Sequence, residues 1–525
     1  MKRLVVALLL ICATSIAGAE TTGKEWQASG RLTSDITLTN ISGGSSADSD
    51  REKTTHNEEL NLNISGPLWN GESGVETRSR TTNDDRIQKD GVELLYFNSY
   101  YRDKIWAVEA GDVAAGLNPY IYSGGLKGIR AAYKSPEERG AWDYTLISGL
   151  NKGLWREFYA NTTDEAPTAF AGAFEAKYIH DTAKTVSFSI AGLKDDLASV
   201  RSNTTVVGSQ GFGVGLDGSW RFNRLVTLAG RTALTRGTND IRNGAPDSYH
   251  NAVLLKLLTK PVAPLRSAFT YQRVSTGFVS FGGSGNQDIE QIENATTWDI
   301  GSSLTANLNL KASHDNLNGA LGATQKNYYE FGQLTYYPAF IKRAEISIHA
   351  SNKDITGRGA DNNQLTAGAD FALRSKSGWR YGVGYEFSDY TDGKSSSSSQ
   401  TTNTCKALLG YKHNLSDDRS YRVTLNANYI GIKDQQDKVG FKIDAGYSHN
   451  RKLSMDLLYM TDFIDMRQSD NRTNATYQLR GNYVLDEKGK YVVQLSLEER
   501  DIDVDNQPAS SYDETIGKIS LAMNF

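Results

Sequence analysis

The chain has no long apolar run beyond its first residues. Its mean hydropathy is −0.49, and no later stretch approaches the roughly 20 apolar residues that a membrane-spanning helix needs. This excludes a helical membrane protein. It does not exclude a barrel, in which only every second residue of a strand meets lipid. Proline is also rare, with 9 residues in 525, and no Pro-rich or Ser-rich linker divides the chain into domains.

Cysteine is equally scarce. Of the two cysteines, Cys12 lies in the apolar N-terminal segment, so removal of that segment leaves Cys405 alone. No intrachain disulfide can then form, and no Cys-x-x-Cys-His motif attaches a c-type haem to the chain itself. The formal charge of −4 becomes about −6 without Lys2 and Arg3. This mild acidity gives no support for nucleic-acid binding.

Catalytic and metal-binding motifs are missing as well. None of the 7 histidines has the spacing to a second His or Cys that metal ligands show, and there is no Walker A or G-x-S-x-G motif. We therefore expect no enzymatic activity, no cofactor and no metal. The acidic clusters Asn83-Asp84-Asp85 and Asp48, Asp50 and Glu52 could bind divalent cations that bridge lipopolysaccharide. Solvated loops are the simpler interpretation.

The N-terminus predicts export from the cytoplasm. Lys2 and Arg3 precede the short apolar run LVVALLLICATSIAG, and small residues at 17–19 (Ala-Gly-Ala) follow. A basic start, a short apolar core and an A-x-A site are typical of a secretory signal peptide. We expect residues 1–19 to be removed and residues 20–525 to form a single domain.

Alternation of apolar and polar residues continues through that domain. Residues 421–429 alternate in this way, as do 212–222, 379–387 and 475–483. Alternate residues of a strand face opposite sides, and runs of about 9–11 residues suit a tilted strand that crosses a bilayer. The pattern predicts an all-β, antiparallel up-and-down transmembrane barrel of about 26 strands (roughly 24–28), the first of them at 26–41.

The connections between these runs alternate in length. Short turns are expected at 101–104, 134–140, 180–184, 222–224, 374–378 and 485–490. Long polar segments are expected at 43–56, 150–168, 277–294 and 389–403. Outer-membrane barrels have short periplasmic turns and longer extracellular loops, so an even number of strands would place both termini in the periplasm. The first strand begins so near Glu20 that we expect no N-terminal plug domain.

The last strand has an apolar face that ends on an aromatic residue and consists of Ile519, Leu521, Met523 and Phe525. It resembles the C-terminal strand of Gram-negative outer-membrane β-barrels, whose terminal Phe is read by the barrel assembly machinery. That resemblance implies that these four residues are an assembly signal. Five tryptophans beside the predicted periplasmic turns are expected to form an aromatic girdle at the lipid interface: Trp69, Trp106, Trp142, Trp220 and Trp379.

The polar register predicts residues that face a water-filled lumen. They are Asp217, Arg221, Arg380, Glu386, Arg422, Lys442, Asp444 and Arg480. Both signs of charge are present, which predicts weak ion selectivity at most. The opposite register should face outer-membrane lipid and lipopolysaccharide.

Strand number sets the width of the barrel. About 26 strands, spaced about 4.8 Å apart and tilted by about 40°, give a backbone diameter of roughly 50 Å. Porins with 16–18 strands already hold an aqueous channel, and 22-stranded transporters hold a plug. An open hole of this width would leak small proteins. Either the loops fold inward or another polypeptide occupies the lumen.

Over the expected mature chain, this plugless architecture resembles the sheath porins of porin–cytochrome conduits, in which the barrel insulates a multihaem c-type cytochrome. The resemblance implies a passive trans-outer-membrane conduit for extracellular electron transfer, with a cytochrome in the lumen. The best-known sheath family carries an N-terminal Cys-x-x-Cys, which is missing here. The lipopolysaccharide-inserting barrel is of similar size, but its jellyroll and paired cysteines are missing too. The alternatives are a general diffusion porin, an exopolysaccharide export channel, or a structural or adhesive barrel.

The predicted register can be tested with a pair of neighbouring substitutions. Leu425→Arg, on the predicted lipid face, should destabilise the barrel by about 2–4 kcal/mol, whereas Asn426→Arg, on the lumen face, should be close to neutral. Refolding into lipid vesicles measures both. Equal sensitivity at the two positions would contradict the register.

Overall fold

The computed structural model describes residues 25–43, 54–84, 92–151, 155, 168–196, 208–238, 248–262, 264–281, 288–319, 322–395, 398–450, 452–467, 469–486, 488–507 and 510–525. Its elements are β1 (Gln27–Gly43), β2 (Thr54–Leu68), β3 (Gly71–Thr82), β4 (Val92–Arg102), β5 (Trp106–Gly116), β6 (Ser123–Tyr133), β7 (Ala141–Asn151), β8 (Thr168–Asp181), β9 (Lys184–Asp196), β10 (Gln210–Arg221), β11 (Val226–Thr238), β12 (Ser248–Val262), β13 (Leu265–Val274), β14 (Ile289–Ile300), β15 (Leu304–His314), β16 (Lys326–Tyr336), β17 (Ala344–Gly357), β18 (Ala360–Arg374), β19 (Trp379–Asp392), β20 (Gln400–Ser416), β21 (Arg419–Ile432), β22 (Gln436–His449), β23 (Leu453–Met466), β24 (Arg472–Val484), β25 (Tyr491–Val504) and β26 (Tyr512–Asn524).

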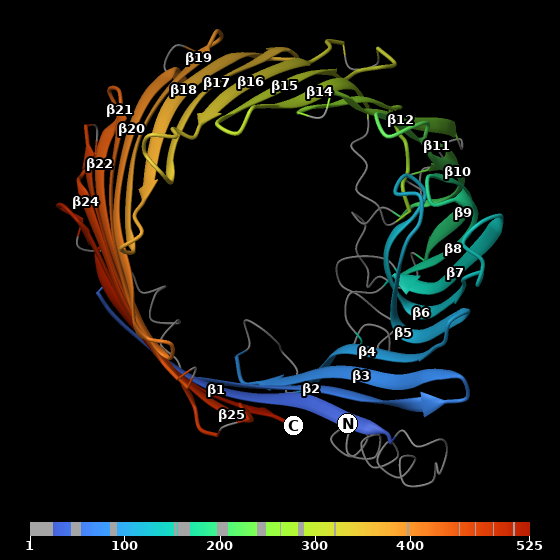
Figure 1. The fold of residues 1–525 in the computed structure, drawn as a ribbon, viewed down its shortest axis with the longest axis horizontal. Coiled ribbons are helices and arrows are strands. Elements are labelled where there is room, and N and C mark those ends of the chain that lie inside the picture. Colours follow the sequence, from blue (N-terminus) through green and yellow to red (C-terminus); the bar gives the residue numbers. More distant parts are fainter. Residues whose placement is uncertain are drawn as a thin grey trace.

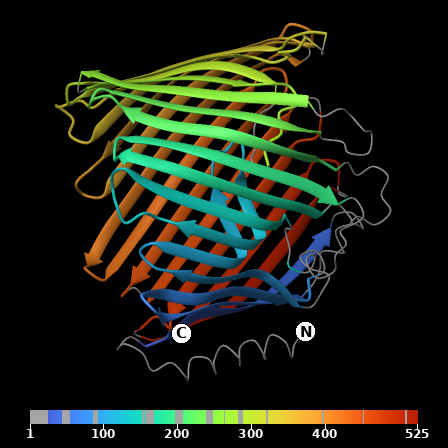
Figure 2. The same ribbon diagram turned by 90° about the vertical axis from the view of Figure 1, so that its right-hand side faces the viewer.

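These strands form a single closed antiparallel barrel (Figure 1). Each strand pairs with the next one along the chain, and β26 returns to pair with β1. The strands run obliquely across the wall (Figure 2), as closure of a sheet requires. The prediction of an up-and-down barrel of about 26 strands is confirmed.

The closing seam joins β1 and β26 from Arg31 opposite Asn524 to Gly43 opposite Tyr512. On one face of the seam, Ile36 lies opposite Ile519, and both side chains are exposed. On the other face, Lys518 Nζ lies 2.9 Å from the Asp35 carboxylate, to which the Ser520 hydroxyl also donates. Apolar contacts outside and polar contacts inside therefore fix the register, because a slip by one residue would exchange the two faces.

The alternation makes the outer face of the barrel apolar all around the ring. Large exposed apolar residues on this face include Phe188, Leu216, Leu234, Leu255, Ile292, Leu308, Ile348, Val383, Leu425, Leu457, Leu479, Leu495 and Ile519. An apolar surface of this extent is far larger than the patches of a few hundred Å² that soluble proteins expose. A belt of this kind is typical of a barrel whose wall faces lipid. Within the described ranges, no helix has both the length and the apolar character needed to span a membrane.

We call the two ends of the barrel the turn end and the loop end. The turn end carries short connections such as 103–105, 182–183 and 222–225, and both described chain ends lie there. At the loop end, longer stretches of sequence separate consecutive strands, as between Gly43 and Thr54 and between Asn151 and Thr168.

Several predicted boundaries were wrong, mainly because the strands are longer than expected, at 10 to 17 residues. The first strand is Gln27–Gly43. The loops predicted at 277–294 and 389–403 are shorter, since β14 begins at Ile289 and β19 and β20 leave only 393–399 between them. Polar residues extend these ladders: the Thr401 hydroxyl donates to Asp389 at 2.7 Å across the β19–β20 pair.

The prediction that short and long connections alternate was also wrong, for example at two connections. Residues 358–359 and 433–435 form short connections at the loop end, where longer loops were expected. Arg358 and Asp434 have positive φ values of 41° and 61° there, as tight hairpin turns require. The predicted signal peptide, the acidic residues Asp48, Asp50 and Glu52, and Asp85 lie outside the described residues.

The seam also places the C-terminal residue of the chain. Phe525 exchanges two backbone hydrogen bonds with Gly30, at 2.8 and 3.0 Å. A Cβ at Gly30 would lie 2.6 Å from the Phe525 ring, so this glycine leaves room for the terminal aromatic. The predicted signal residues Ile519, Leu521, Met523 and Phe525 lie on the outer face of this strand, and their role in assembly stays a prediction.

We predict that Phe525→Asp blocks barrel assembly without blocking export, because it replaces an aromatic on the lipid-facing face of the seam with a charge. Cell fractionation combined with heat-modifiable gel mobility measures this. Asp513→Asn, in the same strand at the loop end, is a control that should assemble normally. Normal insertion of the Phe525→Asp variant would contradict the proposed signal.

Candidate functional site: an arm folded into the barrel

One hairpin leaves the wall halfway along its length. Strands β5 and β6 pair with each other from Trp106–Tyr133 to Gly116–Ser123. However, β4 pairs with β5 only as far as Gly111, and β7 pairs with β6 only as far as Lys127. Among the described residues, the remaining part of the hairpin, residues 112–126, therefore has no β-ladder partner in β4 or β7, and we call this part the arm. Figure 1 shows this blue segment running inside the ring, along the wall that β7–β11 form.

The arm bends away at Gly111 and Asp112. Gly111 has a φ of +117°, and a Cβ there would collide with the Phe97 carbonyl oxygen. The Asp112 carboxylate accepts hydrogen bonds from the Phe97 backbone N–H at 2.7 Å and from Trp155 Nε1 at 2.6 Å. Lys127 Nζ pairs with the same carboxylate at 2.6 Å. Asp112 thus replaces the strand partner that β4 loses, because a buried backbone N–H left unpaired would destabilise the wall.

The tip of the arm packs against the inner face of the wall. Ile121 is completely buried among small residues, which include Ala191, Ala233 and Ala252. Asn118, also completely buried, donates through Nδ2 to the carbonyl oxygens of Leu216 and Thr232 at 3.4 and 3.3 Å.

Glycines in β10 make this close approach feasible. A Cβ at Gly215 would lie 2.6 Å from Ile121 Cγ1 and 2.7 Å from Asn118 Nδ2. A Cβ at Gly213 would lie 3.1 Å from Ile121 Cδ1 and 3.3 Å from Phe281. The inner face of β10 is therefore shaped to receive the arm, and any larger side chain at Gly215 would push the tip away.

A second loop-end segment holds the arm down. Ser275–Phe281 follows β13, and the Phe281 N–H donates to the Ile121 carbonyl at 3.0 Å. The Ser280 hydroxyl donates to the Pro119 carbonyl at 3.0 Å, and the rings of Tyr120 and Phe278 meet edge to face at 5.9 Å. Burial of one such aromatic ring contributes about 1.5–3 kcal/mol, so the arm and Ser275–Phe281 form one well-packed unit.

Opposite charges meet on the inner wall at several of the positions predicted to face the lumen. Asp217 pairs with Arg231 at 2.6 Å. Glu386, also on the inner face, lies 3.5 Å from a ring nitrogen of His349. Arg422 contacts both Asp444 and Asp456, at 3.3 and 2.7 Å. Arg221, Arg380, Lys442 and Arg480 lie on the same inner register of their strands. Their influence on ion passage stays a prediction.

The five predicted girdle tryptophans all lie at the turn end. Trp106, Trp142, Trp220 and Trp379 are at or next to a strand end, and Trp69 is in the β2–β3 turn. They pack on neighbouring outer-face aromatic rings, such as Tyr411 at 4.6 Å from Trp379 and Tyr133 at 5.0 Å from Trp106. Within the part of the chain that the structure describes, no three His, Cys, Asp or Glu side chains gather in a way that could hold a metal ion.

Sequence reasoning missed the arm. Its signal was the segment 117–122 (LNPYIY), where four bulky apolar or aromatic residues and a proline interrupt the alternation between two strand-like runs. The second signal was the pair Gly213 and Gly215 on the polar register, where small residues leave room for an inner partner. The sequence alone does not show that these two segments meet, because they are far apart along the chain.

A closed 26-stranded wall with an apolar outer face and a charged inner face defines the class of this protein as a large β-barrel of the outer-membrane type. No protein-family model matches the chain, and the comparison with curated proteins finds no match either. Several solved structures are similar to it. The translocation pore of the P pilus usher PapC has a TM-score of 0.39 at 10% identity, over 95% of this chain and 99% of the usher chain.

Two further solved structures are similar. The siderophore receptor PirA from Pseudomonas aeruginosa has a TM-score of 0.40 at 11% identity, over 94% of this chain and 80% of the receptor. A BenF-like porin from Pseudomonas fluorescens Pf-5 has a TM-score of 0.31 at 10% identity, over 95% of this chain and 99% of the porin. Because these TM-scores lie below 0.5, we infer function from the geometry of this barrel alone.

The docked arm gives a prediction for the channel. Gly215→Val should push Ile121 and Asn118 away from the wall and into the lumen, destabilise the barrel by about 1–3 kcal/mol, lower the mean single-channel conductance and raise its noise. Gly481→Val in β24, where no atom lies within 4 Å of an added Cβ, is the matched control and should leave both unchanged. Planar-bilayer recording of the two variants measures the effect. Identical conductance of the Gly215→Val variant and the unmodified protein would contradict a lumen narrowed by the arm.

Proposed function

We propose that the chain forms a passive conduit through the outer membrane of a Gram-negative bacterium, with no catalysis of its own. In this proposal both termini are in the periplasm, so that the turn end faces the periplasm and the loop end faces the cell exterior. The apolar outer belt supports the membrane location, and the charged inner wall supports an aqueous interior.

The observation that carries the proposal is the one-sided placement of the arm in a very wide ring. The buried cluster that contains the arm tip and Ser275–Phe281 involves wall strands from β7 to β14. Arg380, Lys406 and Lys442, on the inner faces of β19, β20 and β22, remain exposed. A ring of about 26 strands is roughly 50 Å across, and an arm two strands wide accounts for only about 10 Å of that.

We further propose that this uncovered side of the lumen holds a polypeptide partner, as a sheath does. Leu408 and Met460 lie on the inner register in line with Lys442, and their side chains are 37% and 38% exposed. Exposed apolar side chains on a wall that is otherwise polar are what a protein contact surface requires. A multihaem c-type cytochrome would give such a conduit a role in extracellular electron transfer.

The arm itself favours a second candidate, a diffusion porin with a constriction formed by loops. In that case the arm and Ser275–Phe281 would set the limiting width, and no partner would be needed. Export of an exopolysaccharide would also need an open lumen, but no described contact favours it over the diffusion porin.

The sheath proposal predicts that the protein purified from its native membrane retains a partner that a haem stain detects. Replacing Leu408 and Met460 with Gln should weaken retention about fivefold per residue, which corresponds to about 1 kcal/mol each. Asn426→Gln, on the inner face between them, is the control. Stable channels from the pure protein, with no retained partner, would contradict the sheath and favour the constricted porin.

A further inference from the structure

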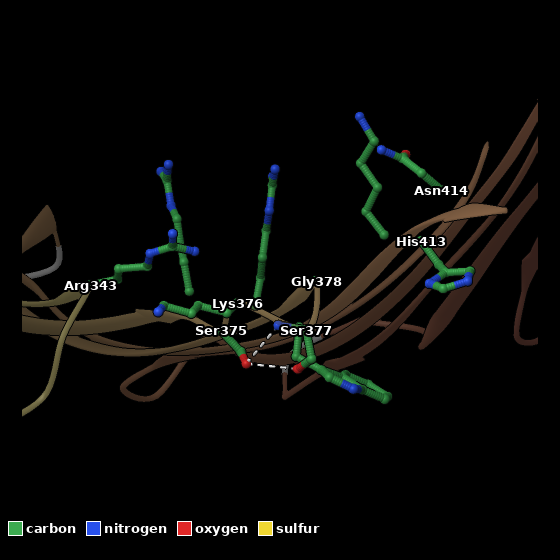
Figure 3. Close-up of a pocket in the computed structure, with 11 residues that line it drawn as sticks. Arg343, Ser375, Lys376, Ser377, Gly378, His413 and Asn414 are labelled. Atoms are coloured by element: carbon green, nitrogen blue, oxygen red, sulfur yellow. Dashed lines mark hydrogen bonds between the residues drawn. The ribbon is translucent and has the colours of Figure 1, made fainter. Parts of the chain in front are cut away.

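A pocket at the turn end gathers basic side chains, and three of them, Arg374, Arg380 and Lys412, lie on the inner face of their strands. It has a volume of about 500 Å³ and is formed by the β16–β17 turn, the β18–β19 turn and the end of β20 (Figure 3). Five of its lining residues are cationic and all are exposed: Arg343, Arg374, Lys376, Arg380 and Lys412. We call these five residues the basic mouth.

Strand pairing places these like charges next to one another. Arg374 lies directly opposite Arg380 in the β18–β19 ladder, and Lys412 lies directly opposite Arg422 in the β20–β21 ladder. Like charges in directly opposite positions destabilise a sheet. Two neighbouring hairpins each contain such a pair of opposite cations. These pairs do not stabilise the fold, so folding stability does not explain why the cations are there.

The basic mouth differs from its surroundings in lacking acidic partners. Arg422, next to it, contacts both Asp444 and Asp456. Among the described residues, none of the five cations of the basic mouth forms an ion pair. Of the nearby acids, Asp370 lies 3.9 Å from His349, and Glu345 does not line the pocket.

The pocket also has a fixed frame and neutral hydrogen-bonding groups. Ser375 and Ser377 bond to each other at 2.7 Å, and the Ser377 N–H donates to the Ser375 hydroxyl (Figure 3). Gly378 has a φ of +92°, and its carbonyl accepts from the Lys412 N–H at 3.0 Å. On the opposite face, Trp379 packs on Tyr411. Hydrogen bonds within the β18–β19 turn and from this turn to β20 thus hold together the elements that carry four of the five cations.

We propose that the basic mouth is a binding site for a multiply charged anion carrying phosphate or carboxylate groups. Guanidinium and ammonium groups recognise such anions by charge-assisted hydrogen bonds. Arg374, Arg380 and Lys412 share the inner face, away from Trp379, so the ligand is a solute of the aqueous lumen and not a lipid head group. This site needs no lumen partner, so it stands independently of the sheath proposal.

Isothermal titration calorimetry of the full-length protein in neutral detergent tests the site, with inorganic tripolyphosphate as the probe. We expect one saturable site whose affinity falls as salt is raised, since salt screens exposed charges. The triple variant Arg374→Gln, Arg380→Gln, Lys412→Gln should lose at least tenfold in affinity. Heat-modifiable mobility verifies that each variant folds.

The matched control removes three other inner-face cations, by Lys406→Gln, Lys442→Gln and Arg480→Gln. It changes the net charge equally and should alter affinity less than twofold. Equal loss in both triple variants would overturn the proposal, because binding would then reflect the general charge of the lumen. Absence of saturable binding would overturn it as well.

A second titration distinguishes an anionic solute of the lumen from an anionic lipid head group. The protein is reconstituted in phosphatidylcholine vesicles with or without phosphatidylglycerol, and tripolyphosphate is titrated again. Unchanged affinity supports a solute site. Loss of binding in the anionic vesicles would overturn it in favour of a lipid head-group site.

Discussion

Backbone hydrogen bonding within lipid is the constraint on which the rest of this structure depends. Each strand of the wall must pair on both sides, because an unpaired N–H or C=O in hydrocarbon costs several kcal/mol. The ladder between β1 and β26 satisfies this requirement and removes both sheet edges. Closure then ties width to strand number, so that a wall of 26 strands encloses a space much wider than that of a porin.

That width explains the features found inside the ring. The arm can leave the wall only because Asp112 bonds to Phe97 in place of a strand partner. It stays folded inward because Ile121 and Asn118 fit against Gly215 and because Ser275–Phe281 covers them. On the opposite side, the inner wall remains exposed and carries charges together with Leu408 and Met460. The chain itself thus covers one side of the inner wall, and the proposed partner would contact the opposite side.

Local sequence patterns were sufficient to predict the wall. Alternation at 421–429 lies within β21, and the short turn predicted at 222–224 lies between β10 and β11. The ends of the strands were harder to predict, because polar residues such as Asp389 and Thr401 can extend a β-ladder as readily as they form a loop. The arm could not be predicted, since Ile121 and Gly215 meet only through the closed barrel. Pairing of Arg422 with Asp444 likewise depends on the register of β21 and β22, which alternation alone does not fix.

The barrel encloses a wide lumen, which the arm narrows from one side only. Polymer exclusion measures this most directly, by recording the single-channel conductance of the pure protein with neutral polyethylene glycols of increasing size. Polymers about 20 Å in diameter should still enter and lower the conductance, because a ring of roughly 50 Å with an arm on one side leaves room for them. Exclusion of all polymers larger than about 10 Å, the scale of a 16–18-stranded porin, would contradict it.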